Sequence, residues 1–332
     1  MAVGGSPAPI NYTYFRLPCP DIHFTNTLML PMKPNVAVLM VSDFELTAQK
    51  TWQDEIEALK AFVAQDFDQD FELILVENSR FASDVPEAIH QLAPHARILF
   101  TDETQSAKLK DYAVKHTDAD LIAVVDADCT PNKVWLKTLV SALQEHPDVD
   151  VVGGRTWYGD QSVYHRCLNL LHRAFDDYGK PSPSEHISNN GALYRRKVLE
   201  TYPYPEAITP FFSSRLRNRR IREGGHRFYF HRDARLQHAI GPLAFMFDVH
   251  RNMGYADMMQ DHSGPSYTSI PRVMLQRTKH EIATLRRVGR DYLKPSDWIL
   301  LPLFMLMGRC FEIVGMLDAI AKRDSIPKSA FR

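Results

Sequence analysis

Two aspartates one residue apart, Asp126 and Asp128, follow a run of five apolar residues, Leu121 to Val125. Such a run is typical of a strand buried in a parallel sheet. Two carboxylates at its end can hold Mn²⁺ or Mg²⁺ through hard oxygen ligands. A cation held there can bridge phosphate groups and neutralise charge on a leaving group. The alternative is structural, because Asp128 could instead cap the helix predicted after Pro131.

Polar side chains also follow two earlier predicted strands. Ser42 and Asp43 come after the apolar run 36–41, and Glu77 comes after the run 71–76. In an open α/β sheet, ligands bind beyond the carboxyl ends of the strands. We therefore expect Ser42, Asp43 and Glu77 to lie near Asp126 and to bind a ligand there.

The elements that must position these side chains alternate between strand and helix. Apolar runs predict strands at 36–41, 71–76, 97–100, 121–125 and 149–152, and helical spacing predicts helices at 51–64, 85–92, 106–116 and 134–144. The alternation predicts an α/β fold with an open, mostly parallel sheet flanked by helices. After Gly153 the alternation weakens, and from Leu243 onward the pattern becomes helical.

Composition excludes several classes of protein. The chain has 332 residues and a net charge of −1, so no overall field favours a nucleic-acid partner. Its 4 cysteines show no CxxC spacing, which favours a reducing compartment. The first residues lack a basic segment followed by an apolar run, as a signal peptide would have. We expect a cytoplasmic protein.

Five motifs in order resemble glycosyltransferase family 2, whose members have the GT-A fold of the nucleotide-diphospho-sugar transferase superfamily. The motifs are the strand with its DxD signature at 120–131, a base- and ribose-binding strand end at 76–79, a basic segment at 106–111, an acceptor-side loop at 189–196, and a strand ending in histidine at 225–238. Together they span roughly residues 35 to 240. The order of five motifs is more specific than any one of them.

The resemblance implies a role for each candidate residue. The metal ligands would be Asp126, Asp128 and His238. The donor would contact Ser42, Asp43, Glu77, Lys108, Lys110, Asp126, Arg195 and Arg196. Glu77 would accept hydrogen bonds from the base or ribose, and the two arginines would clamp phosphate. Each has a structural alternative as a solvated surface residue.

The resemblance also implies a function and four regions. The regions are an N-terminal tail or wrap at 1–33, a nucleotide-sugar-binding half at 34–155, an acceptor-binding half at 156–240, and a helical C-terminal region at 241–332. The implied activity is transfer of a sugar, with a UDP-sugar favoured, to a saccharide or lipid hydroxyl in the presence of Mn²⁺ or Mg²⁺. The alternative is a catalytically silent protein that binds a nucleotide sugar or a partner. A nucleotidyltransferase is disfavoured, because residues 41–46 contain no glycine.

One departure from the family concerns the catalytic base. Where members carry Glu-Asp before an Arg-Leu helix, this chain has Ser213-Ser214, and serine cannot accept a proton at neutral pH without its own base. Glu206 is our first candidate, and Asp176, Asp177 and Glu185 are the alternatives. A retaining mechanism would need no separate base.

The C-terminal region contains an apolar run, Trp298 to Leu317, that approaches the roughly 20 residues of a membrane span. Arg309, Glu312 and Pro302 interrupt it, so we expect it to lie on an anionic membrane surface. The basic residues upstream that could meet lipid headgroups are Arg272, Arg277, Lys279, Arg286, Arg287 and Arg290. The alternative is a helix packed on the domain or across a homo-oligomer.

Overall fold

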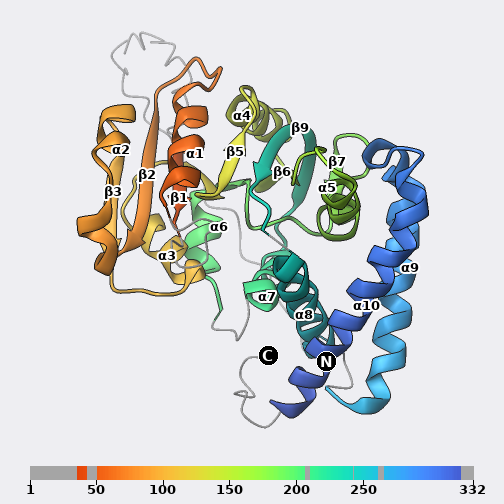
Figure 1. Cartoon of the computed structure of the whole chain (residues 1–332). Coiled ribbons are helices and arrows are strands. Elements are labelled where there is room, and N and C mark those ends of the chain that lie inside the picture. The colour runs from red at the N-terminus through yellow and green to blue at the C-terminus, as the bar shows by residue number, and fades with distance from the viewer. Residues whose placement is uncertain (1–35, 43–50, 206–209, 242, 261–264, 323–332) are drawn as a thin grey trace, which may run out of the picture. The chain divides into compact units, whose positions relative to one another are not determined.

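The computed structural model describes residues 36–42, 51–205, 210–241, 243–260 and 265–322. The described residues all belong to one compact unit (Figure 1). The divisions expected at residues 155 and 240 stay predictions.

One sheet of nine strands runs through this unit in the order β3-β2-β1-β4-β8-β6-β9-β5, with β7 paired to β9. The strands are β1 (Val36–Val41), β2 (Phe71–Asn78), β3 (Arg97–Thr101), β4 (Leu121–Asp126), β5 (Cys129–Pro131), β6 (Val151–Trp157), β7 (Ser182–Ser184), β8 (Ala192–Arg195) and β9 (Phe228–His238). Strands β3, β2, β1 and β4 are parallel. Strand β8 is antiparallel to both β4 and β6, and β9 is parallel to β6 but antiparallel to β5. The predicted α/β fold with a mostly parallel sheet is confirmed.

Ten α-helices and four short helical turns complete the described residues. They are α1 (Gln53–Val63), η1 (Ser79–Asp84), α2 (Glu87–Leu92), α3 (Ser106–Val114), α4 (Trp135–Glu145), α5 (Val163–Leu168), η2 (Asn169–Arg173), η3 (Ala174–Asp176), α6 (Arg196–Thr201), α7 (Pro210–Glu223), α8 (Leu243–Met259), η4 (Tyr267–Ser269), α9 (Ile270–Tyr292) and α10 (Asp297–Ala321). The predicted strand at 149–152 begins at Val151 instead. Val149 is buried, but its N–H donates to the His146 carbonyl and closes the turn after α4.

The sheet is buried on both faces, which explains why β1 is apolar at every position. Alternate residues of a strand face opposite sides, and Val38 and Leu39 accordingly belong to different core clusters. Side chains of α1, α2 and α4 pack in the first cluster, and side chains of α3, α6 and α7 pack in the second. These helices therefore fix the carboxyl ends of β1, β2 and β4 at one edge of the sheet.

The C-terminal helices pack through glycines. An added Cβ at Gly315 of α10 would lie 1.8 Å from the Arg251 carbonyl oxygen, and one at Gly254 of α8 would lie 2.1 Å from the Glu312 carbonyl oxygen. Helices α8 and α10 are thus in backbone contact, and α9 lies beside α10 (Figure 1). Among the described residues α10 alone is long and apolar enough to cross a membrane, and only 28% of its most apolar window is buried.

Candidate active site at the carboxyl edge of the sheet

Asp126, the last residue of β4, forms an ion pair with Lys110 of α3, and 2.7 Å separates Lys110 Nζ from Asp126 Oδ1. The Lys110 side chain is 8% exposed and that of Asp126 is 31% exposed. Burial opposes the charge on Lys110, but the Asp126 carboxylate outweighs it and holds the pKa of the amine above its usual value. The structure thus brings together two residues that the sequence placed near the donor.

Asp128 and His238 meet across the antiparallel pair β5 and β9, in which Cys129 pairs with His238. The distance from Asp128 Oδ2 to His238 Nδ1 is 3.3 Å. His238 Nδ1 also lies 2.6 Å from the Ala239 carbonyl, which can only accept a hydrogen bond. Nδ1 therefore carries the proton, and Nε2 keeps a lone pair with which it could bind a metal. A carboxylate oxygen and an imidazole nitrogen suit Mn²⁺.

Cys129 completes a group of three, because the ligand atoms of Asp128, Cys129 and His238 all lie within 4.8 Å of one another. Burial and the two neighbouring aspartates raise the pKa of the Cys129 thiol well above its usual value. Because Mn²⁺ and Mg²⁺ prefer oxygen and nitrogen ligands to sulfur, the ligands that suit them in this group are Asp128 and His238. Asp126 is not one of the three.

Asn190 connects the two parts of this site. Its Oδ1 accepts from the Asp126 N–H at 2.9 Å, and its Nδ2 donates to Cys129 Sγ at 3.1 Å. The following Gly191 has φ +85°, where an L side chain is strained, and an added Cβ would lie 2.8 Å from Leu236 Cδ2. The loop expected on the acceptor side therefore adjoins the end of β4.

Ser42 and Glu77 lie at the ends of β1 and β2, and both side chains are buried. Ser42 Oγ donates to Glu55 Oε1 at 2.9 Å, and Glu77 Oε1 accepts from the Asn78 N–H at 2.5 Å. Glu77 is 1% exposed. Lys108 is half-buried in the first turns of α3, two residues before Lys110. Asp43 and Glu206 lie outside the described residues.

Two carboxylates of α1 were missed by the sequence reasoning. Burial, followed by the charge of Asp128, raises the pKa of Asp54, and within the described residues Asp54 Oδ2 has no hydrogen-bond partner. Burial raises the pKa of Glu55 to about 7. Both stand in the first turn of a helix that follows a strand, where the helix faces the ligand-binding edge. That placement could have identified them.

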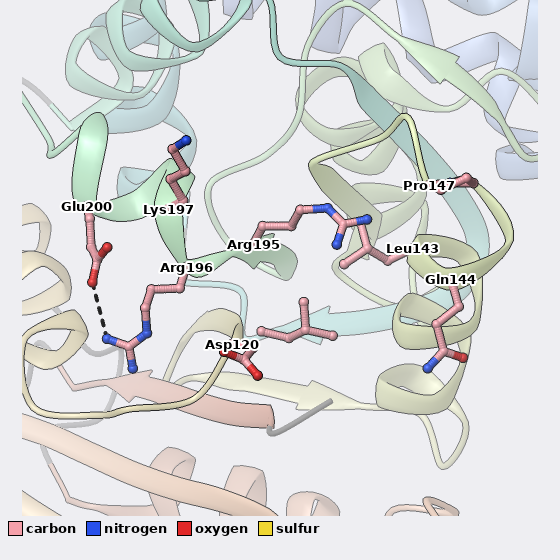
Figure 2. A pocket seen from close by; sticks show the side chains of 9 residues that line it. Asp120, Leu143, Gln144, Pro147, Arg195, Arg196, Lys197 and Glu200 are labelled. Atoms are coloured by element: carbon pink, nitrogen blue, oxygen red, sulfur yellow. Dashed lines mark hydrogen bonds and ion pairs between the residues drawn. The ribbon is translucent and has the colours of Figure 1, made fainter. Parts of the chain in front are cut away.

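Arg195 and Arg196 lie at the other end of the sheet, which corrects their expected role as a phosphate clamp. Arg195 pairs with Leu121, the first residue of β4, whereas Asp126 is the last. At about 3.3 Å per residue the separation along the strand is roughly 16 Å. Both arginines line a separate hollow, where Arg196 pairs with Glu200 (Figure 2). They were assigned from the motif at 189–196. The loop at the start of that motif reaches the site, but the strand end that carries the two arginines does not.

The position of the missing Glu-Asp pair also adjoins the site. Ser213 and Ser214 lie in the first turn of α7, and Asn189 Nδ2 donates to Ser214 Oγ at 2.6 Å. Asn189 precedes Asn190, so Ser214 connects to Asp126 through two asparagines.

The fold is that of GT-A type glycosyltransferases. Residues 53–202 match the family model described as glycosyl transferase family 2. This match confirms the resemblance of the motifs and supports glycosyl transfer as the class of activity.

Many solved structures are similar to the chain, among them the following two. No curated protein matches it. The mannosyltransferase PcManGT from Pyrobaculum calidifontis, solved in complex with GDP-Man and Mn²⁺, is 16% identical with a TM-score of 0.55, covering 87% of this chain and 88% of that one. TarS residues 1–349 from S. aureus is 14% identical with a TM-score of 0.46, covering 88% of this chain and 91% of that one. Because the sequence identity is so low, the similarity to PcManGT concerns the fold alone.

Proposed function

We propose that this protein transfers a sugar from a nucleoside diphosphate to a hydroxyl acceptor, with Mn²⁺ or Mg²⁺ bound by Asp128 and His238. The observation that carries the proposal is the contact of these two side chains, with His238 Nε2 left available by the bond from Nδ1 to Ala239. When bound, the cation would neutralise negative charge on the departing diphosphate. The orientation of His238 by a backbone carbonyl is a common feature of metal-binding histidines.

The remaining residues of this edge support binding of a nucleotide. Glu77 and Ser42 lie at neighbouring strand ends, where the base and ribose would be held by hydrogen bonds. Lys110 and Asp126 neutralise each other, so this pair would orient the ribose rather than add charge. By resemblance the nucleotide is UDP, but PcManGT was solved with GDP-Man, so both nucleotides are candidates.

The acceptor side would need a base for an inverting reaction. Asp177 is poorly suited, because it is fully buried, accepts from the Tyr292 hydroxyl at 2.8 Å and contacts Arg155 and Arg232. The Glu185 side chain is 90% exposed, and Asp176 contacts His186. We retain Glu206 as the proposed base, and Glu206→Gln should lower kcat by about 10²–10⁴-fold without weakening donor binding. Unchanged kcat would remove Glu206, and product with retained anomeric configuration would remove the need for a base.

A panel of ligands tests the proposal. UDP, GDP, a UDP-sugar and a GDP-sugar are added with and without Mn²⁺, and the midpoint of thermal unfolding is measured. A ligand that binds only the folded chain raises the midpoint, and at 100 times its Kd the stabilisation is about 2.7 kcal/mol. We expect one donor to stabilise the protein only with Mn²⁺. No stabilisation by any of them would overturn the proposal.

The second candidate is a silent binding protein of the same fold, which the serines at positions 213 and 214 favour. It predicts Mn²⁺-dependent donor binding without transfer or hydrolysis of the sugar. Release of nucleoside diphosphate, measured with the donor that the thermal panel identifies, separates the two candidates.

We also propose that the exposed face of α10 lies on an anionic membrane at its cytoplasmic side. That face is apolar along the helix and includes Ile299, Leu303, Leu306, Val314 and Leu317. The exposed basic residues of α9 that would meet headgroups are Arg272, Lys279, Arg286 and Arg290. Arg277 is not available, because it is buried beside Glu281 and Glu312. The alternative occupant of the face is a second copy of the chain.

A further inference from the structure

Arg173 lies beside the Asp128 and His238 pair, at the end of η2. Its guanidinium carbon is 4.9 Å from the centre of the Tyr158 ring, and the Tyr158 ring meets His238 edge-on at 5.7 Å. Burial opposes the charge on Arg173, but Tyr158, Cys129 and Asp128 together hold its pKa above the usual value. A permanent positive charge therefore sits one aromatic ring away from the proposed metal ligand.

This cation has no carboxylate partner within 4.0 Å among the residues that the structure describes, and its Nε is buried without a hydrogen bond. Two buried arginines, Arg166 and Arg277, have such partners in Asp297 and Glu312, whereas buried Arg217 bonds the Tyr202 carbonyl instead. Arg173 as a whole is only partly buried, so a cation without a carboxylate partner is open here to a ligand of opposite charge. The position next to the metal ligands indicates an anionic ligand.

We propose that Arg173 binds the diphosphate of the donor, an inference that rests on the proposed function. A guanidinium presents parallel N–H donors that match two phosphate oxygens, as an ammonium does not. The diphosphate would then be held between the cation on Asp128 and the guanidinium of Arg173. This is the role that the sequence motif assigned to Arg195 and Arg196.

A series of buried, hydrogen-bonded side chains fixes Tyr158, whose ring Arg173 covers. His250 Nδ1 lies 2.9 Å from Glu312 Oε1, His250 Nε2 lies 2.8 Å from His172 Nε2, and His172 Nδ1 lies 3.5 Å from the Tyr158 hydroxyl. Burial lowers the pKa of both histidines, so both are neutral near pH 7.

Only one arrangement of protons satisfies this chain. His250 donates through Nδ1 to Glu312, which makes its Nε2 an acceptor; His172 then donates through Nε2 and accepts from Tyr158 through Nδ1. The Tyr158 proton is therefore directed to His172, and its remaining lone pairs are free to accept from Arg173. The contacts that begin at Glu312 of α10 thus orient the Tyr158 hydroxyl.

Calorimetric titration of the full chain with UDP and with GDP, each with Mn²⁺, tests the inference in Arg173→Gln. Arg195→Gln is the matched control, because Arg195 lies at the other end of the sheet. We expect Arg173→Gln to weaken binding of the nucleoside diphosphate by about 10- to 100-fold, the size of a lost charge-assisted contact, and Arg195→Gln to change it little. Binding of Mn²⁺ alone, followed by electron paramagnetic resonance, should be unchanged in Arg173→Gln.

Each result has one meaning. Unchanged nucleoside diphosphate affinity in Arg173→Gln overturns the inference while the proposed function stands. Equal losses of Mn²⁺ and diphosphate binding would show that Arg173 only supports the fold of the site, and would also overturn it. If the unmodified chain binds neither UDP nor GDP, the proposed function itself fails, and the inference fails with it.

Discussion

Lys110 and Asp126 join α3 to the end of β4 through a largely buried ion pair of 2.7 Å. Loss of one partner leaves the other charged and poorly solvated, which is more harmful than loss of both. The donor edge of the sheet therefore depends on this pair for its stability as well as for its shape.

We predict that Asp126→Asn lowers the free energy of unfolding by about 2–3 kcal/mol, below the value for a fully buried pair because Asp126 is partly exposed. Chemical denaturation measures the change. The double variant Asp126→Asn with Lys110→Met should recover most of the loss. The control is Asp148→Asn, whose exposed pair with Arg227 should matter little. A double variant less stable than Asp126→Asn would contradict this account.

Asp128→Asn, unlike Asp126→Asn, should leave the stability of the fold unchanged and weaken metal binding. The Asp128 side chain is 19% exposed and its only charged contact among the described residues is with His238, so the fold should be unharmed. We expect Mn²⁺ affinity to fall at least tenfold, because a carboxylate ligand is replaced by an amide. Electron paramagnetic resonance of free Mn²⁺ and circular dichroism measure the two properties. Undiminished Mn²⁺ binding by the folded variant would argue against this metal site.

Glu55 should make stability depend on pH. Its pKa is raised from 4.5 to about 7, so between these values the folded chain keeps a proton that the unfolded chain has lost. Stability therefore falls as pH rises through this window, by about 2–4 kcal/mol. Glu55→Gln removes the ionisation and can still accept from Ser42, so it should stabilise the protein at pH 8 more than at pH 5. The control Glu57→Gln alters an exposed residue of the same helix. An equal effect of Glu55→Gln at both pH values would refute the prediction.

The backbone contact between α8 and α10 should tolerate no side chain. In Gly315→Ala the new Cβ would lie 1.8 Å from the Arg251 carbonyl oxygen, so the helices must separate. We expect a loss of about 1–3 kcal/mol or more, as for overpacked cores. Thermal unfolding measures the change, with Cys310→Ala on the exposed side of α10 as the control. A wild-type midpoint in Gly315→Ala would show that α10 does not pack against α8 in solution.

The apolar face of α10 predicts binding to lipid vesicles. We expect the protein to float with vesicles containing anionic lipid at low salt, and to do so less as salt rises. Leu306→Glu, at a position 62% exposed, should weaken flotation without loss of stability. If the protein stays in the soluble fraction and gel filtration shows a dimer that Leu306→Glu dissociates, a second copy rather than a membrane covers this face.

The carboxyl edge of the sheet could be predicted from the sequence, because local patterns determine the strands that end there. Strand β4 is an apolar run that ends at Asp126, and such runs determine both the strand and the position of the residue that follows. Helix α10 was predicted as apolar, but the inward direction of Glu312 depends on partners in α8 and α9. Local patterns do not contain that information.

The contacts that could not be predicted join segments far apart in the chain. Arg173 reaches the site only because η2 brings it to Tyr158, and neither residue belongs to a recognisable motif. Arg195 was misplaced for a related reason: β8 is antiparallel to β4, so the motif starts near Asp126 and ends about 16 Å away. The direction of β8 in the sheet is set by tertiary packing.

The pairing of β5 with β9 also bears on how the protein is made. His238 follows Asp128 by some 110 residues. At a synthesis rate of about 5–20 residues per second, roughly 5–20 seconds pass between the two ligands leaving the site of translation. Strands β1 to β4 can fold in that interval, but the proposed metal site cannot form before β9 is synthesised. A nascent chain that ends before β9 would therefore have a nucleotide edge without a metal site, and would be unable to consume donor while it is still attached to the ribosome.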